Sequence, residues 1–253
     1  MRLALVVEYE GTKYHGFQYQ QNVPTIQEDL EKAIERFTGE KVRIKGAGRT
    51  DSGVHASGQV IAFDTNSNHL VETVTAALNF HLPKDIAVKS TFEVDTEFDP
   101  RRHALSRTYA YSIINTRTRT SLMRRTSHHV AESLDIKLMQ RSAKLFVGTW
   151  DFSRFAATPE NPEVSTIREI FESKITTNGN MVTFRVRGSS FLQHQVRRMA
   201  GILVEAGRGK AAPGDINNML SGQSGDNIAH SLPPNGLCLE SVQYTNFPPK
   251  DKY

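Results

Sequence analysis

The sequence has little cysteine and no long hydrophobic run. Its 253 residues include one cysteine, Cys238, so no disulfide can form within the chain and no cysteine cluster can bind a metal ion. The first apolar run, Leu3 to Val7, stops at Glu8, and no run approaches the length of a membrane span. We therefore expect a soluble protein of the cytoplasm that does not associate with a membrane.

The motifs of several enzyme classes are also missing. The histidines show neither HxxxH nor HExxH spacing, so we expect no metal site. The chain has no GxSxG, no Walker loop and no GxGxxG after a strand. These absences argue against a serine hydrolase of the α/β type and against the common nucleotide-binding enzymes.

Acidic residues are absent from one long segment, although the chain as a whole is close to balanced, with 31 Lys plus Arg against 27 Asp plus Glu. Residues 101–131 contain no aspartate or glutamate, but seven arginines: Arg101, Arg102, Arg107, Arg117, Arg119, Arg124 and Arg125. A solvated basic face would explain such a cluster. Guanidinium groups also match phosphate oxygens and stack on bases, which favours a nucleic acid as partner.

Hydrophobic periodicity predicts an α+β fold. In the first half we expect a strand over 3–9, a helix over 26–37 with a capping box from Thr25 to Glu28, a short strand around Val42 and Ile44, a strand from Gln59, a helix over 70–80 and a strand from Ile86. The predicted order is βαββαβ. Two fused units of this split, ferredoxin-like kind would bury mostly antiparallel sheets under helices.

The second half is expected to repeat this order. The predicted elements are a strand from Arg107, a helix over 136–146, two strands joined at Asn178-Gly179-Asn180, a long helix over 190–206, a shorter one over 213–220, and the strand "LCLESVQY". We expect domains over residues 1–104 and 105–253. The loop "ATPENPE" and the tail "FPPKDKY" are the segments that we expect to be loosely held.

Candidate chemistry centres on Asp51 in the stretch "GAGRTDSGVHASGQV". It is the only acidic residue between Glu40 and Asp64, and it follows several basic residues, including Arg49. A nearby arginine keeps a carboxylate ionised, which suits a nucleophile or base, whereas an acid/base pair would need a second carboxylate, and none is near in sequence. On spacing alone, an Asp–Arg pair that only stiffens a glycine-rich turn is favoured over a catalytic one.

Two further patterns could serve either packing or function. Tyr109 and Tyr111 alternate on one predicted strand and therefore face the same side. On the long helix, His194, Arg197 and Gly201 share one face. Core packing and solvent exposure are the ordinary explanations for such residues.

Several motifs together resemble the TruA family of tRNA pseudouridine synthases. They are "EYEGTKYHGFQYQ", "TIQEDLEKA", "GAGRTDSGVHASGQV", "HLPKDIAV", "FDPRRHALSRTYAY", "FLQHQVRRMAG" and "LPPNGLCLESVQY", in the family's order and over nearly the whole chain. Ser52 departs from the alanine that the family usually has. The resemblance implies an isomerase that converts uridine to pseudouridine in the anticodon stem-loop of tRNA, at positions 38, 39 or 40, as a homodimer with no cofactor.

The same resemblance assigns roles to individual residues. Asp51 is implied as the catalytic carboxylate in a cleft between the two domains, Tyr109 as the ring that stacks on the target uracil, and Arg197 as the cation beside Asp51. Arg49 would contact the RNA or help to displace the base. Further RNA contacts are expected at Arg101, Arg102, Arg107 and His194.

Two other hypotheses are weaker. A non-catalytic RNA-binding module explains the basic segment but gives Asp51 no role, since a carboxylate repels phosphate. A hydrolase of the glycosidase type needs a partner acid that is not near Asp51 in the sequence.

Overall fold

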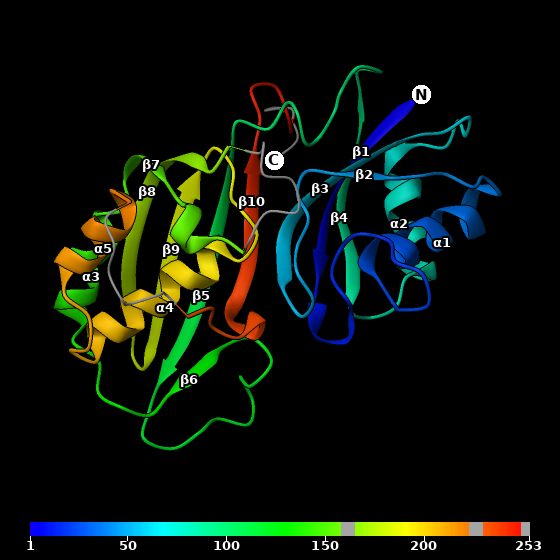
Figure 1. Cartoon of the computed structure of the whole chain (residues 1–253). Helices are drawn as coiled ribbons and strands as arrows, with labels where there is room; N and C mark the ends of the chain where they lie inside the picture. Colours follow the sequence, from blue (N-terminus) through cyan, green and yellow to red (C-terminus); the bar gives the residue numbers. More distant parts are fainter. Residues whose placement is uncertain (158–164, 223–229, 249–253) are drawn as a thin grey trace. The chain divides into compact units, whose positions relative to one another are not determined.

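The structure is a computed structural model of the chain, and it describes residues 1–157, 165–222 and 230–248 (Figure 1). Most of the segments "ATPENPE" and "FPPKDKY" lies outside these residues, although Phe247 of the second segment is described and is buried. The chain forms two compact units, Met1–Ser106 with Cys238–Tyr253, and Arg107–Leu237. The change after Ser106 lies close to the boundary expected at 104, while the final segment groups with the first unit.

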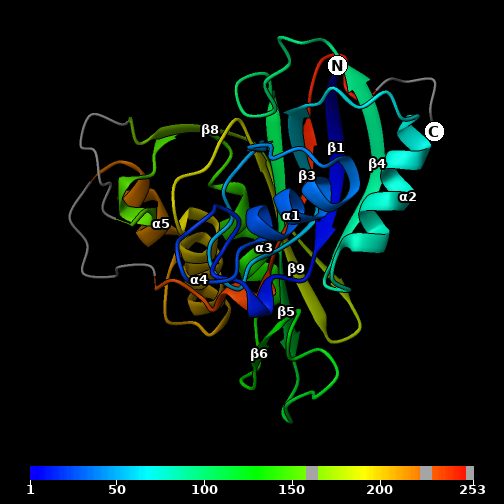
Figure 2. The same cartoon turned by 90° about the vertical axis from the view of Figure 1, so that its right-hand side faces the viewer.

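In its described residues, the first unit contains two α-helices, a short 3-10 helix and a sheet. Its elements are β1 (Arg2–Tyr9), η1 (Gly11–Lys13), α1 (Ile26–Thr38), β2 (Lys45–Gly46), β3 (His55–Asp64), α2 (Val71–His81), β4 (Ile86–Val94) and β10 (Leu237–Gln243). The strand order is β4-β1-β3-β10, with β2 also on β3. All these pairs are antiparallel except β3 with β10, where Cys238 lies opposite His55. Helices α1 and α2 pack against each other, and α2 lies against β4 (Figure 2).

The pattern of α1 shows why this helix was predictable. The Thr25 hydroxyl accepts a hydrogen bond from the Glu28 amide at 3.3 Å, and Gly39, whose φ is +76°, caps the helix after Thr38. The predicted apolar face is buried, with Leu30 and Ile34 almost inaccessible to solvent. Burying each such side chain contributes about 1.5–3 kcal/mol to folding.

Two strand boundaries in this unit differ from the prediction. The short strand is Lys45–Gly46, and Ile44 instead donates its amide to the Glu31 carboxylate at 3.0 Å. Strand β3 begins at His55, before Gln59, because its first residues pair with β10. A pairing partner so distant in the sequence cannot be inferred from local periodicity.

The described part of the second unit consists of a sheet, three α-helices and two short 3-10 helices. Its elements are β5 (Ser106–Asn115), β6 (His128–Val130), α3 (Ile136–Lys144), β7 (Gly148–Asp151), η2 (Ser153–Phe155), β8 (Ile167–Asn178), β9 (Met181–Gly188), α4 (Gln195–Gly207), α5 (Pro213–Leu220) and η3 (Pro234–Gly236). The order β5-β9-β8-β7 is antiparallel, and β6 runs parallel to β5. The predicted turn at Gly179 joins β8 to β9. Strands β6 and β7 were not predicted, so they interrupt the expected order of the second half.

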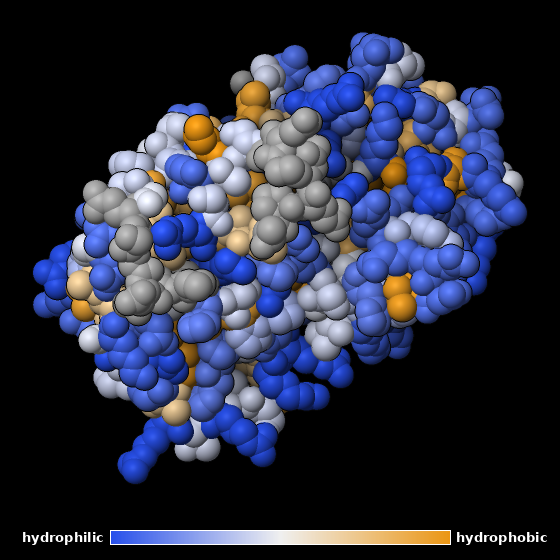
Figure 3. Space-filling view, viewed as in Figure 1, coloured by the Kyte–Doolittle hydropathy of each residue, from blue (hydrophilic) through white to orange (hydrophobic). Residues whose placement is uncertain are grey.

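Helix α4 begins five residues later than predicted. His194, just before it, has a left-handed backbone with φ of +63°, and the Gln195 side chain accepts the Leu192 amide at 2.8 Å. Phe191 therefore lies in the preceding turn and not on the helix. The α+β class is confirmed, and no helix among the described residues is long and apolar enough to cross a membrane. The face in Figure 3 is mainly hydrophilic, with small separate hydrophobic patches.

Candidate active site

Asp51 lies in the loop between β2 and β3 of the first unit, and its side chain is half-buried. Main-chain hydrogen bonds hold this loop against the segment that follows β1. Phe17 donates its amide to the Thr50 carbonyl at 3.0 Å, and Gly53 donates to the Tyr14 carbonyl at 3.2 Å. The backbone is therefore anchored on both sides of Asp51, which fixes the position of the main chain from which its carboxylate extends.

Glycines permit the close approach of these two segments. A Cβ atom on Gly16 would lie 2.8 Å from the Thr50 carbonyl oxygen, and the φ of Gly16 is +96°. A Cβ atom on Gly46 would likewise come too close to the Phe17 ring. Among the four glycines around Asp51, Gly53 has a positive φ, so close packing as well as turn geometry explains the composition of the loop.

The buried side chains of Tyr9, Thr50 and Gln59 support the loop through hydrogen bonds. The hydroxyls of Tyr9 and Thr50 are 2.9 Å apart. The Gln59 amide nitrogen donates to the Gly48 carbonyl at 2.9 Å and lies 3.4 Å from the Tyr9 hydroxyl. The network thus holds the residues on either side of Arg49, whose own side chain is exposed.

A cavity of about 270 Å³ lies beside Arg49. We call it the basic cavity, because its lining includes Arg43, Lys45, Arg49, Arg101 and Arg102 against a single carboxylate, Asp99. The sequence predicted Arg101 and Arg102 as RNA contacts, and both side chains are exposed. The sequence analysis did not predict that these two arginines lie beside Arg43 and Lys45, nor that Asp99 contributes to the same cavity. The dipeptide Asp99-Pro100, which often starts a turn, was a signal that could have revealed it.

Tyr109 belongs to the second unit, on β5. Its ring is 8% exposed and packs edge-on against Phe191, with ring centroids 5.2 Å apart. Tyr111, two residues along the strand, is fully buried and donates its hydroxyl to the Pro233 carbonyl at 2.8 Å. Of the two tyrosines, Tyr111 thus has a clear packing role.

Arg197 lies in the first turn of α4, also in the second unit. Its Nε donates to the Leu232 carbonyl at 2.7 Å, which holds the base of the guanidinium. His194 immediately precedes the helix and is half-buried. Within this unit Arg107 donates to the Ser189 carbonyl at 2.9 Å, so part of its donor capacity already serves the fold.

The arginines of residues 101–131 do not all belong to one compact unit. Arg101 and Arg102 lie in the first, and the other five lie in the second. Four of those five, at positions 117, 119, 124 and 125, are exposed between β5 and β6. In the described parts of the chain, no three His, Cys, Asp or Glu side chains are grouped as metal ligands would be.

Comparison with known proteins identifies the family. A family model described as tRNA pseudouridine synthase matches residues 5–101 and 142–245. The chain belongs to the tRNA pseudouridine synthase family. The matched ranges include Asp51, Arg49 and Arg197, whereas Tyr109 falls between them.

Individual relatives are similar over almost their full length. The chain is 42% identical to tRNA pseudouridine synthase A of Myxococcus xanthus over 249 residues, which cover 98% of this chain and 94% of the relative. It is 40% identical to that of Acetivibrio thermocellus (95% and 98% covered) and 41% identical to that of Geotalea daltonii (96% and 99% covered). The resemblance found in the sequence motifs is thereby confirmed.

Proposed function

We propose that this protein isomerises uridine to pseudouridine in tRNA and that Asp51 is its single catalytic carboxylate. The observation that carries the proposal is the anchoring of the Asp51 loop in a chain of this family. Hydrogen bonds at Thr50 and Gly53 fix the backbone around a half-buried carboxylate. A catalytic group needs this kind of preorganisation, because a small misplacement of the reacting atoms is costly in rate.

The reaction is balanced without a cofactor. The bond between uracil N1 and ribose C1′ breaks, a bond from C5 to C1′ forms, and the proton lost from C5 is matched by one gained at N1. Asp51 could attack the sugar, attack the base or abstract a ribose proton. Each of these roles requires a carboxylate at this position.

The proposal includes roles for residues of the second unit. Arg197 serves as the cation that pairs with the Asp51 carboxylate during the reaction, and Tyr109 as the ring on which the displaced uracil stacks, since a base must leave its helix before it can react. Arg197→Met should lower the rate at saturating enzyme much more than the affinity for tRNA. An equal loss in both would make Arg197 a phosphate contact instead.

Target and assembly belong to the same proposal. We propose the anticodon stem-loop, at positions 38, 39 or 40, as the substrate region, and a cytoplasmic homodimer as the active form. Sedimentation equilibrium would test the dimer, because a single chain has a mass of 28.3 kDa. The proposal also treats the two halves of the chain as split ferredoxin-like modules, the second closed by β10 and with β6 and β7 as additions, and an experimental structure would test this.

The decisive variant is Asp51→Asn, which removes the charge and keeps the size. It should form no pseudouridine in a single-turnover assay with unmodified tRNA, while its affinity for that tRNA stays within about tenfold of wild type. Asp95→Asn is the matched control. The Asp95 side chain accepts the Glu97 amide at 2.8 Å, a bond that asparagine can keep, so this variant should react as wild type.

The outcomes separate the three hypotheses. Turnover by Asp51→Asn would exclude Asp51 as the catalytic group. Binding of tRNA without any reaction by the wild-type protein would favour a binding module. Release of free uracil in place of pseudouridine would indicate a hydrolase.

A further inference from the structure

The basic cavity lies within the first unit, and its cations come from three segments of chain. Arg43 and Lys45 come from the segment that ends in β2, Arg49 from the Asp51 loop, and Arg101 and Arg102 from the turn after β4. Its volume, about 270 Å³, is just below the range of about 300–1,000 Å³ that is usual for small-molecule sites. It would hold a phosphate with part of a ribose, but not a large cofactor.

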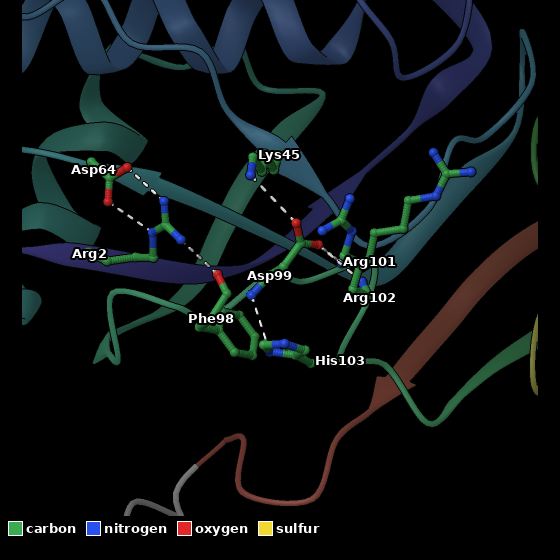
Figure 4. A network of polar contacts seen from close by, with 8 residues as sticks. All are labelled: Arg2, Lys45, Asp64, Phe98, Asp99, Arg101, Arg102 and His103. Carbon is green, nitrogen blue, oxygen red and sulfur yellow. Dashed lines mark hydrogen bonds and ion pairs between the residues drawn. The ribbon is translucent and has the colours of Figure 1, made fainter.

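The turn that carries Arg101 and Arg102 is held in place on several sides. The Arg2 guanidinium donates to the Phe98 carbonyl at 3.1 Å (Figure 4). The Tyr244 hydroxyl donates to the Pro100 carbonyl at 2.7 Å. The Phe98 ring contacts the rings of Tyr244 and Phe247 at about 5.3 Å between centroids. The main chain that carries the two arginines is therefore held in place before a ligand binds, which reduces the entropy lost on binding.

Asp99 organises the same turn from within. One of its carboxylate oxygens accepts the amides of Arg101 at 2.9 Å and Arg102 at 3.0 Å, and the other lies 3.5 Å from the Lys45 ammonium (Figure 4). Burial alone would raise the pKa of the Asp99 carboxyl. The two amides and Lys45 outweigh burial and hold that pKa below its ordinary value.

The charges of the lining favour an anion. Five cations face one carboxylate. Arg43 is already engaged, since it pairs with Glu31 at 3.1 Å and lies over the Tyr19 ring. Arg49 and Arg102 form no ion pair with any residue that the structure describes. An internucleotide phosphate carries a negative charge and two non-bridging oxygens, which guanidinium forks bind through pairs of parallel hydrogen bonds.

We propose that the basic cavity binds one backbone phosphate of the tRNA, with Lys45, Arg101 and Arg102 as contacts, and that Asp99 is a positioning residue that shapes the turn without touching the RNA. This inference rests on the proposed function for its ligand, because tRNA is the polyanion that the proposed reaction requires. It adds an RNA contact on the unit that carries Asp51.

The first test measures salt dependence. Filter binding of an unmodified tRNA transcript over a range of salt concentrations would compare wild type with the double variant Lys45→Ala/Arg102→Ala. Each lost phosphate contact lowers the slope of log affinity against log salt by about 0.7–0.9. We expect a decrease of about 0.7–0.9, because the two cations contact the same phosphate. Lys41→Ala/Arg36→Ala is the control, because both side chains are exposed and neither lines the cavity.

The second test separates the effect of the hydrogen bonds that Asp99 accepts from the effect of its negative charge. Asp99→Asn keeps an oxygen for the two amides and removes the negative charge, so tRNA should bind as tightly as to wild type or up to about tenfold more tightly. Asp99→Ala removes the oxygen as well, so the turn loses both caps and affinity should fall several-fold. Circular dichroism would establish that both variants are folded.

Three outcomes would overturn the inference. The double variant could keep the wild-type salt slope, or Asp99→Asn could lose as much affinity for tRNA as Asp99→Ala. Alternatively, inorganic phosphate could protect wild type from thermal unfolding while substitutions in the cavity leave tRNA binding unchanged. The last result would indicate a small-anion site. Pseudouridine formation by wild type, measured in the same preparation, tests the proposed function separately, since the salt slopes report on the cavity whether or not a reaction occurs.

Discussion

At the scale of single residues, the buried network under the Asp51 loop links sequence to proposed chemistry. Tyr9, Thr50 and Gln59 are each almost inaccessible to solvent. The hydrogen bond between the two hydroxyls and the bond from Gln59 to the Gly48 carbonyl hold the chain on both sides of Arg49. The network therefore sets the position of the residues that lead directly to Asp51.

Tyr9→Phe tests whether this support matters for the reaction. Without the hydroxyl, Thr50 loses a buried partner, which should destabilise the fold by about 1–3 kcal/mol. The single-turnover rate should fall more than the affinity for tRNA, because the loop shifts while the phosphate contacts remain. Stability would be measured by urea unfolding and the rate with saturating enzyme.

Tyr19→Phe is the matched control for this change. Tyr19 is exposed, and phenylalanine at this position would keep the ring that lies under Arg43. Loss of the hydroxyl should therefore affect neither stability nor rate. If Tyr9→Phe behaves like the control, the network has no influence on the loop.

At the residue level, the sequence allowed a prediction only where a signal was local. Asp51 stood out because it was the only carboxylate in a basic, glycine-rich stretch. The contact of Tyr9 with Thr50 joins residues 41 positions apart, and that of Tyr9 with Gln59 spans 50. No local pattern marks such a pair, so the buried network could not have been predicted.

At the scale of elements, the segment before β10 is bound to α4 in the second unit. Arg197 exchanges hydrogen bonds with Leu232, and the Tyr111 hydroxyl binds the Pro233 carbonyl. A Cβ atom on Gly201 would lie 2.1 Å from the His230 carbonyl oxygen. The absence of a side chain at Gly201 is therefore what allows this segment to approach the helix.

Gly201→Ala should destabilise the second unit by about 1–3 kcal/mol, because the new methyl group would displace a main-chain carbonyl. Gly214→Ala is the control on α5, where nothing lies within 4 Å of the added atom. It should leave stability unchanged or raise it by up to about 1 kcal/mol, since alanine favours a helix. Urea unfolding of both variants would show the difference, and equal stabilities would mean that the segment does not press on α4.

Elements with local start and stop signals were predicted well. The cap at Thr25 and the glycine at position 39 bound α1, and Gly179 marks the hairpin between β8 and β9. The start of α4 was wrong because His194 adopts a left-handed backbone that histidine rarely shows. Strands β6 and β7 are three and four residues long, which is too short for a periodicity to appear.

At the scale of the whole molecule, membership of the tRNA pseudouridine synthase family rests on motifs spread along the chain. The family model matches both the range that contains Asp51 and the range that contains Arg197. Net charge alone, +4 for 253 residues, would not have identified an RNA partner. The motif order carried that prediction, whereas the grouping of cations in the basic cavity needed the folded chain.

The most direct test of the proposed function maps pseudouridine in cellular tRNA. Cells with the intact gene, without it, and with Asp51→Asn or Asp95→Asn in its place would be compared at each uridine of the anticodon stem-loop. We predict that pseudouridine at one or more of positions 38, 39 and 40 disappears in the deletion and in Asp51→Asn and persists in Asp95→Asn. An unchanged pattern in the deletion, or full modification by Asp51→Asn, would contradict the proposed function.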